Sequence, residues 1–204
     1  MKKTGIAVLL LLGMTVLGGC QGVEPENRIY PMAMAAEATD EGYQVILGMP
    51  DMQSATGQEK QGEGESRTVL SLEGKDFAEI RNLYNRTQEK YLDMGHLKAL
   101  VLGERMIEEK KWGELLTYLK DERFIGEDIY VFQCDDVNVL MENNGSQGIS
   151  VGEYLTGIYE NRPRDRARKG VTLREVYHNW YRWGKLPVLP EVKAGSGTME
   201  LEPV

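Results

Sequence analysis

Apolar and polar residues alternate or run together in five short segments that are typical of β-strands. Residues 29–38 and 43–52 form two of them, and Asp40 and Gly42 between them favour a tight turn. Pro31 is expected at a strand start or edge because it has no N–H to donate to a neighbouring strand. The other three segments are residues 67–74 (RTVLSLEG), 96–104 (HLKALVLGE) and 128–134 (DIYVFQC).

Between these segments, apolar residues recur every three to four positions and predict helices. The clearest helix covers residues 75–95, with Asp76 as N-cap, Glu79 completing a capping box, Tyr91 near its apolar face and Gly95 as its end. Further helices are predicted at residues 105–123 with a break at Gly113, at 135–144 with Asp135 as cap, at 150–161 after Ser150, and at 172–183 before Gly184.

Strands that alternate with helices predict an α/β (α+β) fold, in which one domain holds a mixed β-sheet with helices packed on it. Residues 54–66 are polar and rich in glycine and glutamate, so we expect a flexible loop there. Residues 185–192 contain two prolines and are expected to be extended. Residues 194–204 are expected to form a tail, which leaves 29–193 as the domain.

The first 20 residues follow the plan of a signal peptide. Lys2 and Lys3 precede an apolar run, and small residues then lead directly to Cys20. This arrangement resembles a bacterial lipobox, which implies cleavage after residue 19 and lipidation of Cys20. The alternative is an uncleaved anchor, but the apolar run is short for a span of about 20 residues. Residues 20–28 are then a lipidated tether that attaches the domain to a membrane from outside the cytoplasm.

Charge and cysteine content narrow the classes of function. Removing the two lysines of the signal peptide leaves 22 basic and 32 acidic residues, a net charge of −10. Such an acidic surface argues against general nucleic-acid binding. With Cys20 lipidated, Cys134 is the one remaining cysteine and is expected to be a buried thiol without a disulfide.

Candidate catalytic groups are few. His96 precedes an apolar strand, but no nucleophile motif accompanies it, so we expect a structural ring that reaches a backbone carbonyl. His178 lies in an aromatic helix and is expected to be half-buried. No metal-binding, zinc-finger or nucleotide-binding motif is present, so no cofactor and no metal are expected, and the adjacent acids Glu108/Glu109 and Asp135/Asp136 are expected to point apart.

The basic segment 161–170 contains Arg162, Arg164, Arg166, Arg168 and Lys169. Pro163 and Asp165 interrupt these charges, so the pattern predicts a solvated loop between two helices. The alternative is a contact with anionic headgroups or with an acidic partner, since each basic residue near an anionic surface adds about 1 kcal/mol.

Several short motifs occur in an order that resembles one family. Gly95, His96, Leu97 and Lys98 precede an apolar strand that ends in Gly103 and Glu104, and Ser71, Glu73 and Gly74 precede the first amphipathic helix. From Cys20 to about Lys193 the chain is similar to the N-terminal domain of the Ger(x)C family, the C subunits of spore germinant receptors.

The resemblance implies a protein without catalytic residues that acts in nutrient-triggered spore germination. It implies a lipoprotein on the outer face of the spore inner membrane, docked to integral-membrane A- and B-type receptor subunits. His96 and its neighbours would then be structural markers of the fold. The alternative is a lipoprotein that captures a small molecule for a transporter.

Overall fold

The computed structural model describes residues 22–50, 68–122, 124–145, 148–161, 169–195 and 198–202. The expected lipidation site Cys20, the expected loop 54–66 and the arginines of the basic segment lie outside the described residues. Within the described part, no helix has both the length and the apolar character needed to cross a bilayer.

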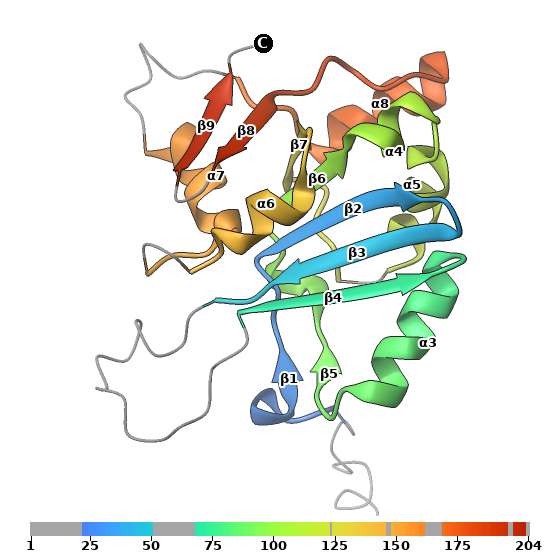
Figure 1. The fold of residues 1–204 in the computed structure, drawn as a ribbon, viewed down its shortest axis with the longest axis vertical. Coiled ribbons are helices and arrows are strands. Elements are labelled where there is room, and N and C mark those ends of the chain that lie inside the picture. Colours follow the sequence, from blue (N-terminus) through green and yellow to red (C-terminus); the bar gives the residue numbers. More distant parts are fainter. Residues whose placement is uncertain are drawn as a thin grey trace, which may run out of the picture.

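A mixed seven-stranded sheet forms the centre of the molecule (Figure 1). Strands β2, β6, β7 and β8 run parallel, and antiparallel strands extend the sheet on both sides of them. In spatial order the strands are β4 (Val69–Gly74), β3 (Gly42–Gly48), β2 (Ala33–Thr39), β6 (Ala99–Gly103), β7 (Tyr130–Cys134), β8 (Glu191–Gly195) and β9 (Thr198–Glu202).

Six described helices cover the two faces of this sheet, so the predicted α/β fold is confirmed (Figure 1). Alternate residues of β2 point to opposite faces: Met34 and Ala36 pack in one core and Ala33 and Ala35 in the other. The first core is closed by α3 (Phe77–Thr87), α4 (Glu104–Glu108), α5 (Trp112–Asp121) and α8 (Leu173–Trp183), and the second by α6 (Val137–Glu142) and α7 (Val151–Glu160).

The first helix is shorter than predicted. Asp76 caps α3 as expected, but the helix ends at Thr87 and Gln88 is already extended. The following residues form β5 (Tyr91–Leu92), which pairs in parallel with β1 (Arg28–Ile29), and then the 3-10 turn η2 (Met94–His96). The helical prediction to Gly95 was wrong because Tyr91 and Leu92 pair with a strand 63 residues earlier in the chain, and this pairing replaced the local periodicity.

Two other helix details differ from the sequence prediction. The break in the second helical segment lies at Lys110, which has a left-handed φ of 56°, and not at Gly113, which lies inside α5. The cap of α6 is Asp136, whose carboxylate accepts from Asn138 N and Val139 N, and not Asp135. In contrast, Gly184 ends α8 in the left-handed conformation, as predicted.

Both ends of the domain contain more regular structure than the sequence predicted. Residues 25–27 form a 3-10 turn directly before β1, so the end of the predicted tether is folded against the domain. The described residues of the predicted tail form the end of β8 and the edge strand β9 instead. Two strands can pair through main-chain hydrogen bonds without many apolar side chains. The polar composition of this segment therefore gave no sign of the pairing between β8 and β9.

Candidate functional site

Strand β6 connects the two groups of family-marker residues. Residues 95–98 lie at its amino end, and Gly103 and Glu104 lie at its carboxyl end. The structure therefore separates the marker into two sites, which are about one strand length apart. Each site has its own set of partners.

At the amino end, an ion pair joins the half-buried Arg28 to the buried Asp93. Asp93 is 6 % exposed, and its carboxylate accepts from Arg28 Nη1 at 2.6 Å and from the backbone N–H of Gly95 at 2.9 Å. The backbone N–H of Asp93 donates to the carbonyl of Ile29 at 2.9 Å. These contacts hold β1 against η2. Removing Arg28 would leave the buried carboxylate of Asp93 without its ion-pair partner.

His96 is exposed and contacts an aromatic ring. Its ring lies edge-on to Tyr30, with centroids 4.6 Å apart and an interplanar angle of 68°. The structure therefore gives it an aromatic partner in place of the expected backbone carbonyl. Leu97, the next residue, is buried. The backbone N–H of Lys98 donates to the carbonyl of Met32 at 2.9 Å, directly before the paired residues of β6 and β2.

Replacing His96 with alanine is expected to lower the free energy of unfolding by about 1 kcal/mol, the value of one edge-to-face ring contact. His178→Ala is the matched control. His178 is exposed and not half-buried as predicted, so its loss should change stability by less than about 0.5 kcal/mol. Denaturant unfolding of both variants measures these effects. If His96→Ala lowered the free energy of unfolding by several kcal/mol, the ring contact with Tyr30 could not account for the loss.

At the carboxyl end, the carboxylate of Glu37 caps helix α4 from the neighbouring strand. Gly103 is the N-cap of α4 and has no side chain to offer. Glu37 Oε1 accepts from the backbone N–H of Met106 at 3.1 Å and of Ala38 at 2.8 Å. A β-carbon at position 103 would overlap this carboxylate, so Gly103 is the residue that makes room for it. Burial raises the pKa of Glu37, while these two N–H groups act in the opposite direction.

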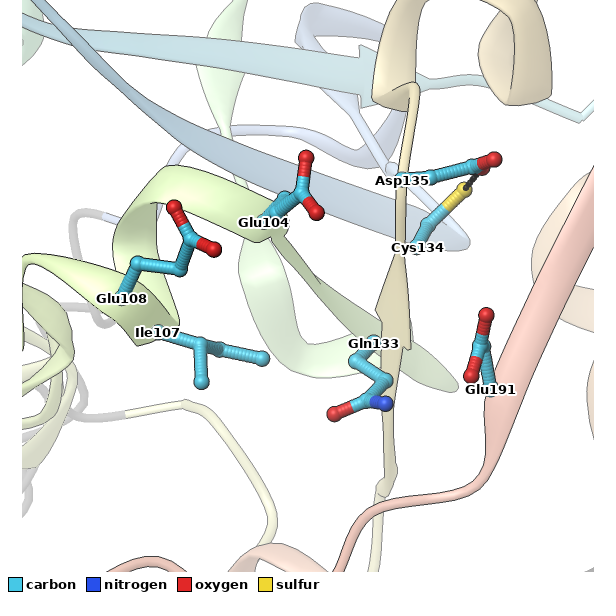
Figure 2. Close-up of a pocket in the computed structure, with 7 residues that line it drawn as sticks. All are labelled: Glu104, Ile107, Glu108, Gln133, Cys134, Asp135 and Glu191. Atoms are coloured by element: carbon cyan, nitrogen blue, oxygen red, sulfur yellow. Dashed lines mark hydrogen bonds between the residues drawn. The ribbon is translucent and has the colours of Figure 1, made fainter.

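A cavity of about 240 Å³ opens beside this cap, where α4 and α6 leave the sheet toward opposite faces (Figure 2). Carboxylates from three elements surround it: Glu104 and Glu108 on α4, Asp135 after β7, and Glu191 on β8. Ligands of open α/β sheets bind outside the carboxyl ends of the strands at such divergence points. Sequence reasoning missed this cavity because only the topology brings the four carboxylates together.

The chemistry of this cavity is limited. Burial raises the pKa of the Cys134 thiol to about 12, so the sulfur is neutral at physiological pH and is not an activated nucleophile. Its Sγ lies 3.6 Å from an Asp135 carboxylate oxygen (Figure 2). Among the described residues, no three His, Cys, Asp or Glu side chains are placed to hold a metal ion. The cavity is also smaller than typical ligand pockets of about 300–1,000 Å³, and its charge would attract cations and repel anions.

As expected for adjacent acids, the members of each pair serve different contacts. Glu108 lines the cavity, whereas Glu109 forms ion pairs with Arg105 and Lys111. Asp135 lines the cavity, whereas Asp136 caps α6.

The described residues therefore define a three-layer α/β domain whose marker residues hold strands and helix ends together. The model of the spore germination protein N-terminal domain matches residues 21–194. The chain belongs to this family, the Ger(x)C spore germination proteins, and contains their N-terminal domain. No curated protein and no solved structure matches the chain.

Proposed function

We propose that this protein is the lipid-anchored C subunit of a spore germinant receptor. Its domain docks to integral-membrane A- and B-type subunits and takes part in nutrient-triggered germination at the outer face of the spore inner membrane. The observation that carries the proposal is the family match, which begins at Gln21, directly after the lipobox-like Cys20. A domain that starts at the modified cysteine is suited to act on a membrane surface.

The described residues favour binding over chemistry. His96 contacts Tyr30, the Cys134 thiol is neutral, and the carboxylates of the cavity accompany no activated nucleophile. In this proposal the domain contributes surfaces rather than reacting groups. The family has receptor subunits as its members, which supports the same conclusion.

An aromatic surface at the end of α8 is the best-exposed candidate for contact with a partner. Trp183 is 61 % exposed, and Tyr181 on the same helix and Val188 after it are also largely exposed, whereas Leu173 and Val176 of α8 are buried in the core. Lys120 lies over the ring of Tyr181 at 5.0 Å, and Arg182 lies over the ring of Trp183 at 4.9 Å. Aromatic and arginine side chains are enriched in protein interfaces, and exposed apolar patches mark such sites.

Capture of the tagged full-length protein from detergent-solubilised spore inner membranes tests this proposal. We expect A- and B-type subunits to be recovered with the wild-type protein. Trp183→Ala should weaken the association about tenfold or more, because truncating an interfacial tryptophan typically costs more than 1.4 kcal/mol.

Ile149→Ala is the matched control, since Ile149 is an exposed apolar side chain away from α8 and its loss should leave recovery unchanged. Preparations without these subunits, from spores that contain the protein, would contradict the receptor proposal. Full recovery with Trp183→Ala would contradict only the assignment of the α8 surface.

A further inference from the structure

Three exposed apolar side chains lie at the end of the domain that carries β1 and β5. Val23 is 41 % exposed, Tyr91 38 % and Phe124 53 %. They account for three of the seven large hydrophobic side chains that are exposed in the described part of the chain. Exposed apolar side chains that gather at one end of a domain are a candidate contact surface.

Contacts through Arg28 and Asp93 place these three side chains at one end of the domain. Arg28 Nε donates to the carbonyl of Val23 at 2.9 Å, and its guanidinium lies over the ring of Tyr91 at 5.8 Å. Arg28 also pairs with Asp93, which binds the backbone of Gly95, and a β-carbon at Gly95 would lie 3.6 Å from Phe124 Cβ. We call Val23, Tyr91 and Phe124 the N-terminal surface.

The N-terminal surface lies where the chain leads to Cys20. Gly22 follows Cys20 by two residues, so their Cα atoms are at most about 7 Å apart. A β-carbon at Gly22 would lie 3.8 Å from the guanidinium of Arg28, so Gly22 itself borders the N-terminal surface. A lipid on Cys20 would therefore enter the bilayer beside these three side chains.

The segment between Gly22 and the sheet is fixed to the domain. Pro25–Asn27 form a 3-10 turn that is closed by hydrogen bonds from Asn27 N to Glu24 O and from Arg28 N to Pro25 O. The next two residues form β1, which pairs with β5. Figure 1 shows the two strands side by side at one end of the molecule. An anchor attached to a fixed segment determines how the domain faces the membrane.

We propose that the N-terminal surface lies in the interfacial layer of the bilayer that holds Cys20, so that the domain has one orientation on the membrane. This inference rests on the proposed lipidation of Cys20. Tyrosine prefers the headgroup level, and phenylalanine and valine place apolar area at the boundary of the acyl chains. In this orientation β8, β9 and α8 face away from the membrane (Figure 1), where α8 can meet parts of a receptor that project from it.

A bilayer explains the N-terminal surface better than a protein partner does. Three side chains are few for a stable protein interface, which buries about 800 Å² on each partner. A weak contact is sufficient for lipid, because the anchor already holds the domain at high effective concentration. Exposed Glu24, Glu26 and Glu89 outnumber Lys90 and Arg86 around this end, so the contact relies on apolar groups and not on anionic lipid.

Fluorescence quenching by brominated phosphatidylcholine tests the orientation directly. The lipidated full-length protein carries Phe124→Trp and is reconstituted into vesicles of this zwitterionic lipid or of its unbrominated form. Val188→Trp is the matched control, since Val188 is exposed in the segment between α8 and β8. We expect brominated lipid to remove most of the emission added by Phe124→Trp and none of the emission added by Val188→Trp.

Flotation of the same vesicles separates this inference from the anchoring on which it rests. Protein that floats only with an intact Cys20, with Phe124→Trp quenched and Val188→Trp unquenched, supports both. Protein that floats through Cys20 but shows equal quenching at the two positions overturns the orientation alone. Protein that does not float, or that floats equally well as Cys20→Ala, overturns the proposed anchoring and this inference with it.

Discussion

Replacing Asn144 with alanine is expected to lower the free energy of unfolding by about 3–5 kcal/mol, because its buried amide satisfies three backbone groups at once. Asn144 is 5 % exposed, and its Nδ2 donates to the carbonyls of Met49 at 2.9 Å and Thr68 at 2.7 Å. Its Oδ1 accepts from the backbone N–H of Val151 at 2.9 Å. One side chain therefore joins the end of β3, the approach to β4 and the start of α7. Alanine would leave the Met49 carbonyl and the Val151 N–H without this partner, whereas the Thr68 carbonyl keeps the N–H of Met49.

Asn138→Ala is the matched control for this change. Asn138 lies on α6, is exposed, and accepts one hydrogen bond from the side chain of Gln44 at 3.0 Å. Its loss should cost less than about 0.5 kcal/mol. Urea unfolding of the purified protein measures both variants. Similar small effects at the two positions would mean that water replaces the amide of Asn144, and the three-way connection would then contribute little.

Features that repeat locally along the chain could be predicted from the sequence. The apolar run before Gly103 indicated a buried strand, and β6 is buried at every position. Ser150 and Thr172 each precede a glutamate by three residues, and both begin helices with complete capping boxes. The turn at Asp40–Gly42 also joins an antiparallel pair as predicted. In each case, the residues that determine the structure are neighbours in the sequence.

Features that depend on distant partners could not be predicted in this way. Tyr91 fits the apolar face of a helix by its spacing, but it lies in β5 because Arg28 and Ile29 offer a strand to pair with. Glu108 and Asp135 look like ordinary surface acids, and only the divergence of α4 and α6 places them around one cavity. The capping role of Glu37 is hidden for the same reason, since 67 residues separate it from the start of α4.

The two halves of the family marker have a common physical purpose. Around Gly95, the buried Asp93 fixes the chain that leads from Cys20. Around Gly103, a carboxylate from β2 fixes the start of α4. Both sets of contacts join segments that are far apart in sequence to the ends of β6. A marker of this kind preserves the arrangement of the domain, and with it the surfaces on which the proposed contacts depend.

Gly103→Ala is expected to destabilise the domain by about 2–4 kcal/mol, because the new methyl group would displace the carboxylate of Glu37. The displaced carboxylate would lose its hydrogen bonds to Met106 and Ala38 and leave the start of α4 uncapped. Denaturant unfolding, together with the yield of folded protein, measures this effect.

Gly113→Ala is the matched control. A β-carbon there would meet no atom within 4 Å apart from the neighbouring backbone of its own helix, so alanine should stabilise α5 by up to about 1 kcal/mol. The double variant Gly103→Ala with Glu37→Ala tests the cause. Removing the carboxylate makes room for the methyl group. The double variant should therefore lose less stability than the sum of the losses of the two single variants. Two changes that act through one contact cannot both exert their full effect. Strictly additive losses would therefore show that alanine at position 103 destabilises the domain through a contact other than the one with Glu37.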